Sequence, residues 1–210
     1  MIHIVIADDH PLFRKGVQKI LDTTPELRIT GEAGDGGELM ATLARLKNID
    51  LLLLDISMPG TSGIEMIEQV HAVRPRLPVL VVSMHEEEQY ALRALKSGCR
   101  GYVVKSGSPE ELIGAIRTVL RGDRYISARI AQNLAEYLAR DAKKEPHESL
   151  SNREYDILCR IAQGEAVGGI AATLNVSVKT VSTYKARICK KLHCKTNVEL
   201  ARYAIDKKLI

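Results

Sequence analysis

The chain has 210 residues, of which 45% are hydrophobic and 27% are charged. This length suits one large domain or two of ordinary size, and the composition excludes an intrinsically disordered protein. No apolar run approaches the roughly 18–20 residues of a membrane span, so we expect no membrane-spanning segment.

Charge is distributed unevenly along the chain. Residues 1–121 contain 14 Lys and Arg against 16 Asp and Glu, whereas residues 122–210 contain 16 against 10. Within residues 176–195 there are six basic residues and no acidic one. This asymmetry favours two domains, the second with a polyanionic partner. A solvated basic helix face would show the same charges, so charge alone does not decide between the two interpretations.

The start of the chain and its cysteines bear on its location. The chain opens with a short apolar run. A secretory signal would place a basic region and then a longer apolar region before it, so we expect no such signal. The four cysteines lack the spacing of metal ligands, and we expect reduced thiols in a cytoplasmic protein. They are Cys99, Cys159, Cys189 and Cys194.

Short apolar runs alternate with segments of helical periodicity over the first 121 residues. The runs predict strands at 2–7, 28–33, 50–54, 78–83 and 101–104. The periodic segments predict helices at 12–22, 36–47, 63–73, 86–97 and 109–121. Five successive strand–helix units indicate an α/β domain with a five-stranded parallel sheet that helices cover on both faces.

The signal for strands ends near residue 122. A helix is expected at 127–140, followed by an exposed polar linker at 141–149 that Pro146 interrupts. A capping box from Ser151 to Glu154 then opens an all-helical segment. Its helices are expected at 151–163, 168–174, 177–192 and 196–208. The expected domains are therefore 1–121 and 149–210, joined by a linker with a helix over 122–148.

Four charged residues each follow one of the short apolar runs directly. They are Asp8, Asp9, Asp55 and Lys105. The carboxyl ends of parallel strands line the binding crevice of an open α/β sheet, so we expect these side chains to converge. Three carboxylates repel one another unless a cation joins them, and an all-oxygen site with room for a phosphoryl group suits Mg²⁺. The neighbouring His10 is expected at the start of the next helix and not in the metal site.

These residues stand in motifs that resemble those of a two-component receiver domain, in the same order and spacing. The motifs are Asp8-Asp9-His10-Pro11, Asp55-Ile56-Ser57-Met58-Pro59-Gly60, Ser83, and Tyr102-Val103-Val104-Lys105. The resemblance implies a flavodoxin-like fold in which Asp55 accepts a phosphoryl group from the phosphohistidine of a sensor histidine kinase.

The resemblance also implies the roles of the surrounding residues. Mg²⁺ would be held by Asp9, Asp55 and the backbone carbonyl of Ser57, with Asp8 acting through water. Ser83, Tyr102 and Lys105 would form the phosphate switch. In that switch Ser83 moves toward the phosphoryl group and the ring of Tyr102 turns inward.

The second half of the chain resembles the LuxR-type helix-turn-helix output domain of NarL/FixJ response regulators, over nearly all of residues 149–208. The resemblance is carried by Leu150-Ser151-Asn152-Arg153-Glu154, Gln163-Gly164, Ile170-Ala171, Leu174-Asn175-Val176-Ser177, Thr180-Val181 and Lys191-Leu192. Within 177–192, a stripe of Val181, Tyr184, Ile188 and Leu192 is expected to pack on the core. Other residues would face the major groove of DNA. They are Lys179, Thr180, Ser182, Thr183, Lys185, Ala186 and Lys190.

One stretch departs from this pattern. Ala166-Val167-Gly168-Gly169 stands before the scaffold helix, where a Lys usually contacts a phosphate. A Gly costs roughly 1 kcal/mol in a helix interior, so we expect this helix to begin late or to fray.

Together these patterns predict a transcriptional regulator and not an enzyme, with at most slow removal of its own phosphoryl group. Its expected partners are a sensor histidine kinase, double-stranded DNA and a second copy of the chain, with RNA polymerase as a further candidate. Two alternatives stay open. A Mg²⁺-dependent phosphohydrolase with an aspartyl-phosphate intermediate would need a substrate pocket and a second acid/base carboxylate. An interaction adaptor without DNA binding would not need the basic stretch 176–195.

Overall fold

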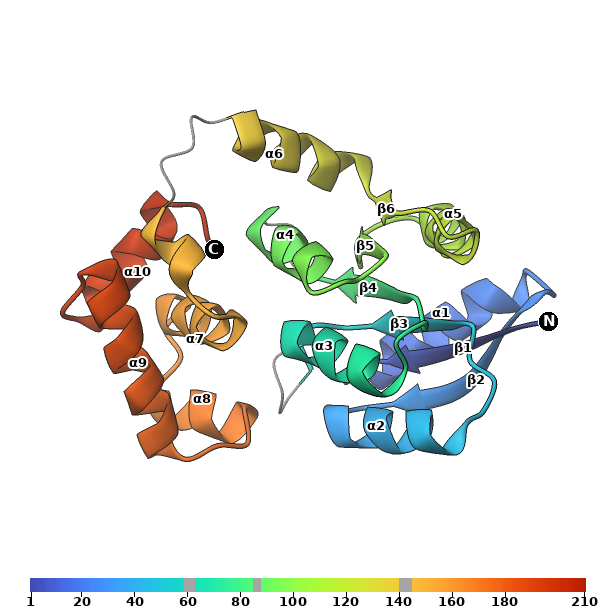
Figure 1. Ribbon diagram of the computed structural model, residues 1–210, viewed down its shortest axis with the longest axis horizontal. Coiled ribbons are helices and arrows are strands. Elements are labelled where there is room, and N and C mark those ends of the chain that lie inside the picture. Colours follow the sequence, from blue (N-terminus) through green and yellow to red (C-terminus); the bar gives the residue numbers. More distant parts are fainter. Residues whose placement is uncertain (59–62, 85–87, 140–144) are drawn as a thin grey trace. The chain divides into compact units, whose positions relative to one another are not determined.

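The first part of the chain forms a parallel sheet whose strand order is β2-β1-β3-β4-β5-β6 (Figure 1). The computed structural model describes residues 1–58, 63–84, 88–139 and 145–210. The strands are β1 (Ile2–Ala7), β2 (Leu27–Ala33), β3 (Leu51–Leu54), β4 (Val79–Ser83), β5 (Gly101–Val104) and β6 (Tyr125–Ile126). The five-stranded parallel sheet expected from the sequence is confirmed, and β6 extends it by pairing parallel to β5. Two residues are too short a run for the sequence to reveal this sixth strand.

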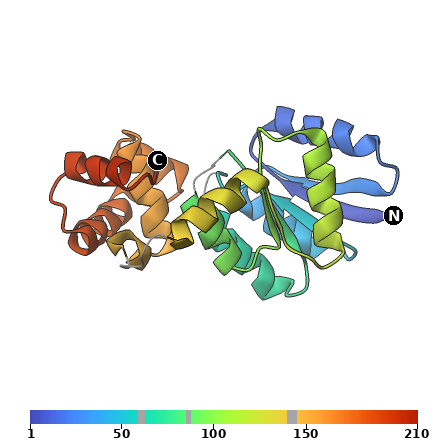
Figure 2. The ribbon, with the colours of Figure 1, turned by 90° about the horizontal axis from the view of Figure 1, so that it is seen from above.

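Helices cover both faces of the sheet (Figure 2). They are α1 (Pro11–Asp22), α2 (Gly36–Arg45), α3 (Gly63–Val73), α4 (Glu88–Lys96) and α5 (Pro109–Leu120). On one face, Ile4 and Ile6 of β1 belong to a core cluster with Val17 of α1 and Ile116 of α5. Strand side chains alternate between faces, so the other buried residues of the same strands meet α2, α3 and α4 on the opposite side. Burial on both faces explains why the strands read as unbroken apolar runs.

Local signals begin two of these helices. Asp35 caps α2, because its carboxylate accepts a hydrogen bond from the Glu38 backbone N–H at 2.9 Å. Ser108 caps α5 in the same way through Glu111, at 3.2 Å, and Pro109 occupies the first helical position. Side-chain oxygens at these positions satisfy backbone donors that have no partner within the helix. The capping residues therefore fix where each helix starts after its strand.

The second part of the chain is helical. The contacts divide the chain into two compact units, Met1–Gln132 and Asn133–Ile210, with α6 (Ala128–Ala139) crossing the boundary. The remaining elements are the 3₁₀ helix η1 (Pro146–Ser149) and the helices α7 (Asn152–Ala162), α8 (Val167–Thr173), α9 (Val178–Leu192) and α10 (Asn197–Asp206). Tyr155, Ile188 and Leu200 are fully buried and supply the core between α7, α9 and α10.

The structure differs from the expected exposed linker at its carboxyl end. Residues 146–149 form η1, and His147 is buried with its Nδ1 3.1 Å from the Tyr203 hydroxyl oxygen. Glu145 forms an ion pair of 2.7 Å with Lys207. The segment ahead of α7 is therefore packed on the helical unit, because its polar residues find partners on α10 and just beyond it.

The expectation of a late or frayed scaffold helix is wrong. Helix α8 begins at Val167 and contains both Gly168 and Gly169. Its Ile170 and Ala171 are buried, and their packing offsets the cost of two glycines.

Some expectations fall outside the described residues. These are the Pro59-Gly60 turn, the start of the helix expected at 86–97, and residues 140–144, which include the end of the helix at 127–140 and the first part of the linker. In the part of the chain that the structure describes, no helix combines the length and the apolar composition that crossing a membrane requires.

Candidate functional sites

The acidic residues of the first unit meet at the carboxyl edge of the sheet, as the sequence predicts. Asp8 and Asp9 follow β1, and Asp55 follows β3, which pairs directly with β1. The connection from β1 leads to β2 on one side, whereas β3 and the later strands lie on the other. Such a reversal of strand order opens the crevice in which ligands bind to doubly wound folds.

Lys105 joins two of the carboxylates. Its Nζ lies 2.7 Å from Asp8 Oδ2 and 2.7 Å from Asp55 Oδ2. All three side chains are almost completely buried, with exposed fractions of 5%, 1% and 0%. The ammonium also lies 4.6 Å from the centre of the Phe13 ring. The sequence analysis did not identify Phe13, because nothing in the residues of α1 indicates which side chain will lie beneath the lysine.

The protonation of this pair reflects both burial and contact. Burial raises the pKa of the Asp55 carboxyl, although the hydrogen bond and the charge of Lys105 oppose that rise. Burial alone would lower the pKa of Lys105, but hydrogen bonds to Asp55 and Asp8 outweigh it and raise the pKa. Lys105 therefore stays an ammonium and holds negative charge next to the crevice.

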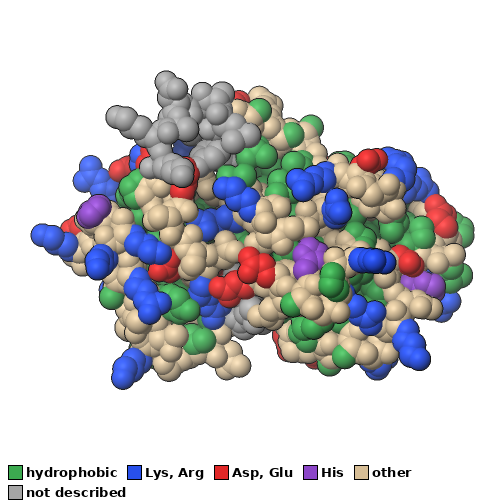
Figure 3. All heavy atoms as spheres, in the orientation of Figure 1, with side chains coloured by type: hydrophobic (Ala, Val, Ile, Leu, Met, Phe, Trp, Pro, Cys, Tyr) green, Lys and Arg blue, Asp and Glu red, His purple; other side chains and the backbone are tan. Residues whose placement is uncertain are grey.

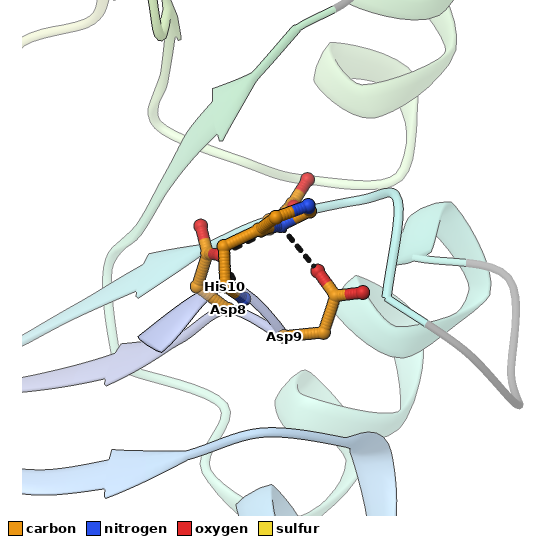
Figure 4. A group of neighbouring side chains, drawn as sticks. Asp8, Asp9 and His10 are labelled. Carbon is orange, nitrogen blue, oxygen red and sulfur yellow. Dashed lines mark hydrogen bonds and ion pairs between the residues drawn. The ribbon is translucent and has the colours of Figure 1, made fainter. Parts of the chain in front are cut away.

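The donor set fits a divalent cation. One ligand atom from each of Asp8, Asp9, His10 and Asp55 lies within 4.8 Å of the others. Three of the four donors are carboxylates, the ligands that Mg²⁺ prefers. His10 precedes α1 directly, as expected, but its Nδ1 also lies 2.7 Å from Asp9 Oδ1 (Figure 4). The ring therefore belongs to the acidic cluster as well as to the start of the helix.

The other predicted residues of this site lie close to Asp55 or on the neighbouring strands. The Ser57 backbone N–H donates to Asp55 Oδ1 at 2.8 Å, which orients the carboxylate. Ser83 ends β4 and Tyr102 lies on β5, and both are fully buried. The Tyr102 ring is thus already inside the unit, which differs from the expectation that phosphorylation turns it inward.

In the second unit, α8 and α9 form the expected helix-turn-helix. Asn175 in the connection adopts a left-handed conformation with φ of 50°, which Asn tolerates better than most residues. Ser177 caps α9 by accepting from the Thr180 backbone N–H at 3.0 Å, and the two hydroxyl oxygens lie 2.8 Å apart. The Thr180 hydroxyl therefore takes part in the cap, which limits it as a contact to DNA.

The expected division of α9 into two faces is visible in its burial. Val181, Ile188 and Leu192 are buried, and Tyr184 is half-buried. Most of the expected DNA contacts lie on the other face. Lys179, Ser182, Thr183, Ala186 and Lys190 are exposed, and Thr180 and Lys185 are half-buried. Figure 3 shows Lys and Arg side chains scattered over the visible surface of the helical unit.

Two internal contacts restrict which residues of α9 can read DNA. The Thr183 hydroxyl donates to the Lys179 carbonyl at 2.9 Å, one helical turn earlier. The Nζ of Lys191 lies 2.6 Å from Glu154 Oε2 on α7, so this lysine stabilises the packing of α9 on α7. The S-x-x-E capping box places Glu154 at the start of α7, but no sequence signal reveals that it also pairs with α9.

Two family models match the chain. The response regulator receiver domain matches residues 4–117, and the bacterial regulatory proteins of the luxR family match residues 148–204. The two models correspond to the sheet-containing part and to the helices η1 to α10.

Several curated proteins resemble the chain over its whole length. It is 35% identical to the response regulator UvrY of Escherichia coli over 206 residues, which cover 98% of the chain and 94% of UvrY. It is 39% identical to the response regulator GacA of Pseudomonas aeruginosa, covering 98% and 96%. A solved structure of RcsB from Salmonella enterica, bound to promoter rprA with BeF₃⁻, is 29% identical with a TM-score of 0.71, covering 96% and 97%.

Proposed function

Because the chain belongs to the NarL/FixJ family of two-component response regulators, we propose that phosphorylation of Asp55 controls how it binds DNA. The protein is a DNA-binding regulator of transcription with a receiver domain and a LuxR-type domain. The observation that carries the proposal is the convergence of Asp8, Asp9, Asp55 and Lys105 at the sheet edge where the strand order reverses.

Asp55 is the side chain best placed to take up the phosphoryl group. Its carboxylate is held by Lys105 on one oxygen and by the Ser57 N–H on the other. A carboxylate attacks phosphorus only if the repulsion between two anions is reduced, and the Lys105 ammonium reduces it. Ser83, at the end of the adjacent β4, would donate its hydroxyl to the new phosphoryl oxygens. The donor of the phosphoryl group would be the phosphohistidine of a sensor histidine kinase.

Asp9, Asp55 and the Ser57 carbonyl would hold Mg²⁺, with Asp8 acting through water. When bound, the cation would neutralise charge on the incoming phosphoryl oxygens. Asp8 contributes differently from Asp9, because its Oδ2 is already paired with Lys105 at 2.7 Å. Among the described residues Asp9 pairs with His10 and with no lysine, and about a third of its side chain is exposed. We therefore expect the loss of Asp9 to reduce phosphoryl uptake more than the loss of Asp8.

The exposed face of α9 would lie in the major groove of DNA. Lys179, Lys185 and Lys190 would hold phosphates, and Ser182 with Ala186 would contact base edges. A homodimer would place two such helices on a pair of half-sites. A phosphohydrolase is disfavoured, because the family models that match the chain are a response regulator receiver domain and the luxR family of regulatory proteins. An adaptor without DNA binding is disfavoured by the exposed lysines of α9.

Incubation of the full chain with acetyl phosphate and Mg²⁺ should add one phosphoryl mass. Asp55→Asn should prevent the addition, Asp9→Ala should abolish it, and Asp8→Ala should only weaken it. The measurement is intact-protein mass spectrometry, with Asp22→Asn as the matched control, since Asp22 is exposed and ends α1 at the opposite edge of the sheet. Uptake by Asp55→Asn at the wild-type level would refute the assignment.

A further inference from the structure

A second charged hollow lies at the opposite edge of the sheet from Asp55. It has a volume of about 480 Å³ and is lined by His71, Arg76, Arg100 and Arg124, together with prolines, a leucine and a glycine. No carboxylate lines it. The volume falls within the range of pockets that bind small molecules, about 300–1,000 Å³.

The topology of the sheet brings the three arginines together. Arg100 directly precedes β5, Arg124 directly precedes β6, and Arg76 lies three residues before β4. These strands are parallel neighbours, so their amino ends lie side by side at spacings of about 5 Å. The same geometry that gathers the aspartates at the carboxyl edge therefore gathers guanidinium groups at the amino edge.

None of the three guanidinium groups has an ion pair or a side-chain hydrogen bond within the part of the chain that the structure describes. Other arginines of this unit are engaged: Arg74 donates to the Leu43 carbonyl at 2.7 Å, and Arg117 pairs with Glu26. Asp123 lies beside Arg124 in sequence, but it pairs with Arg121, at 3.9 Å. Like charges gathered without a counter-charge repel one another, and an anion would relieve that repulsion.

The arginines are not needed to cap the helices that end at this edge. The Gly98 N–H already donates to the Leu95 carbonyl at 3.2 Å, and the Gly122 N–H donates to the Val119 carbonyl at 3.0 Å. Gly98 has a φ of +103°, and a Cβ there would lie 3.0 Å from the His71 ring. Because Gly98 has no side chain, the His71 imidazole can lie beside the hollow.

We propose that this hollow binds a nucleotide-sized anion with two or more phosphate groups, such as a nucleoside diphosphate. Guanidinium groups form paired hydrogen bonds with phosphate oxygens, and three of them can share a diphosphate. Pro75, Leu77 and Pro78 provide an apolar wall against which a base can lie. The site is separate from the phosphorylation site and does not depend on its chemistry.

Calorimetric titration of the full chain without Mg²⁺ tests the proposal, with ADP, pyrophosphate and adenosine as probes. ADP and pyrophosphate should bind with one site per chain, and adenosine should not bind. Arg100→Ala and Arg124→Ala should each weaken binding by roughly tenfold or more, because a hydrogen bond to a charged group contributes about that factor. The matched control is Arg45→Ala, an exposed arginine in the last turn of α2, which should leave binding unchanged.

Three outcomes would overturn the proposal. The first is the absence of binding by either phosphate probe. The second is an equal loss in Arg45→Ala, which would indicate non-specific charge attraction. The third is a loss of double-stranded DNA affinity in Arg100→Ala without any binding of ADP, since the arginines would then serve a macromolecular polyanion. Phosphorylation of Asp55 should proceed normally in these variants whichever result is obtained.

Discussion

The hydroxyl groups of Ser182 and Thr183 look equivalent in sequence but differ in their contacts. The Thr183 hydroxyl donates its proton to the Lys179 carbonyl within the same helix. Its methyl group and its remaining lone pair therefore face outward. Among the described residues Ser182 has no hydrogen-bond partner for its exposed hydroxyl. Ser182 can therefore donate to a base edge, whereas Thr183 offers apolar contact, which suits the methyl group of thymine.

Replacing each hydroxyl should separate these roles. Thr183→Val keeps the shape and the methyl group, so sequence preference should change little, whereas Ser182→Ala should relax preference at one base position, by about 1–3 kcal/mol. Lys179→Ala should weaken binding to all DNA sequences alike. It should also reduce the slope of log affinity against log salt concentration by about one unit. Selection from random DNA, followed by titration at several salt concentrations, measures both effects. Equal loss of preference in Thr183→Val and Ser182→Ala would contradict the distinction.

At the scale of elements, one ion pair links α9 to α7 in the helical unit. Lys191 near the end of α9 contacts Glu154 in the first turn of α7, where Glu154 also accepts from the Ser151 N–H at 2.8 Å. Burial alone would raise the pKa of Glu154, but the Lys191 and Ser151 hydrogen bonds outweigh it and lower the pKa. The Glu154 carboxylate therefore satisfies an unpaired backbone N–H at the start of α7 and also anchors α9.

The packing of α9 on α7 should therefore weaken in acid. A carboxyl group whose pKa is lowered by folding stabilises the fold above its ordinary pKa, about 4.3 for Glu, and this contribution is lost as pH falls through the lowered value. Glu154→Gln should cost about 1–2 kcal/mol at pH 7 and remove this part of the acid sensitivity. Urea unfolding of the full chain, followed by NMR signals of α7 and α9 between pH 3 and 7, gives the measurement. Glu136→Gln is an exposed control on α6. An unchanged pH profile in Glu154→Gln would show that the pair is not responsible.

At the scale of the whole molecule, two compact units share one chain, and η1 belongs to the second. Because His147 and Glu145 are fixed to the region of α10, residues 145–149 are part of the helical unit. We expect coupling between phosphate and DNA to run through association of two chains or release of the output domain. The surface formed by α4, β5 and α5 is the candidate for either event, since Ser83 and Tyr102 lie on the strands beside it.

Phosphorylation should strengthen DNA binding by about 5–150-fold, the usual range of coupling between two sites. Sedimentation and DNA affinity of the full chain, with and without acetyl phosphate, test this, beside the fragment 142–210. A fragment that binds no better than the unphosphorylated chain would exclude inhibition by the receiver. An unchanged mass together with an unchanged affinity would refute the switch.

Much of this protein can be read from local sequence. Runs such as Leu51–Leu54 are apolar throughout because both faces of the sheet are covered, and this pattern predicts the parallel sheet. Strand ends then place Asp8, Asp9 and Asp55 at one edge, since parallel strands end together. Caps at Ser108 and Ser151 mark helix starts because their oxygens bond backbone donors only a few residues away.

Tertiary structure alone decided what depends on contacts between distant segments. Burial of Ile170 and Ala171 carries α8 through two glycines that local propensity disfavours, and β6 forms because β5 offers it an unpaired edge. Lys105 contacts Asp8, which lies 97 positions earlier in the chain, and Lys191 contacts Glu154, which lies 37 positions earlier. Propensity and periodicity describe neighbours along the chain, whereas packing selects partners by their place in space.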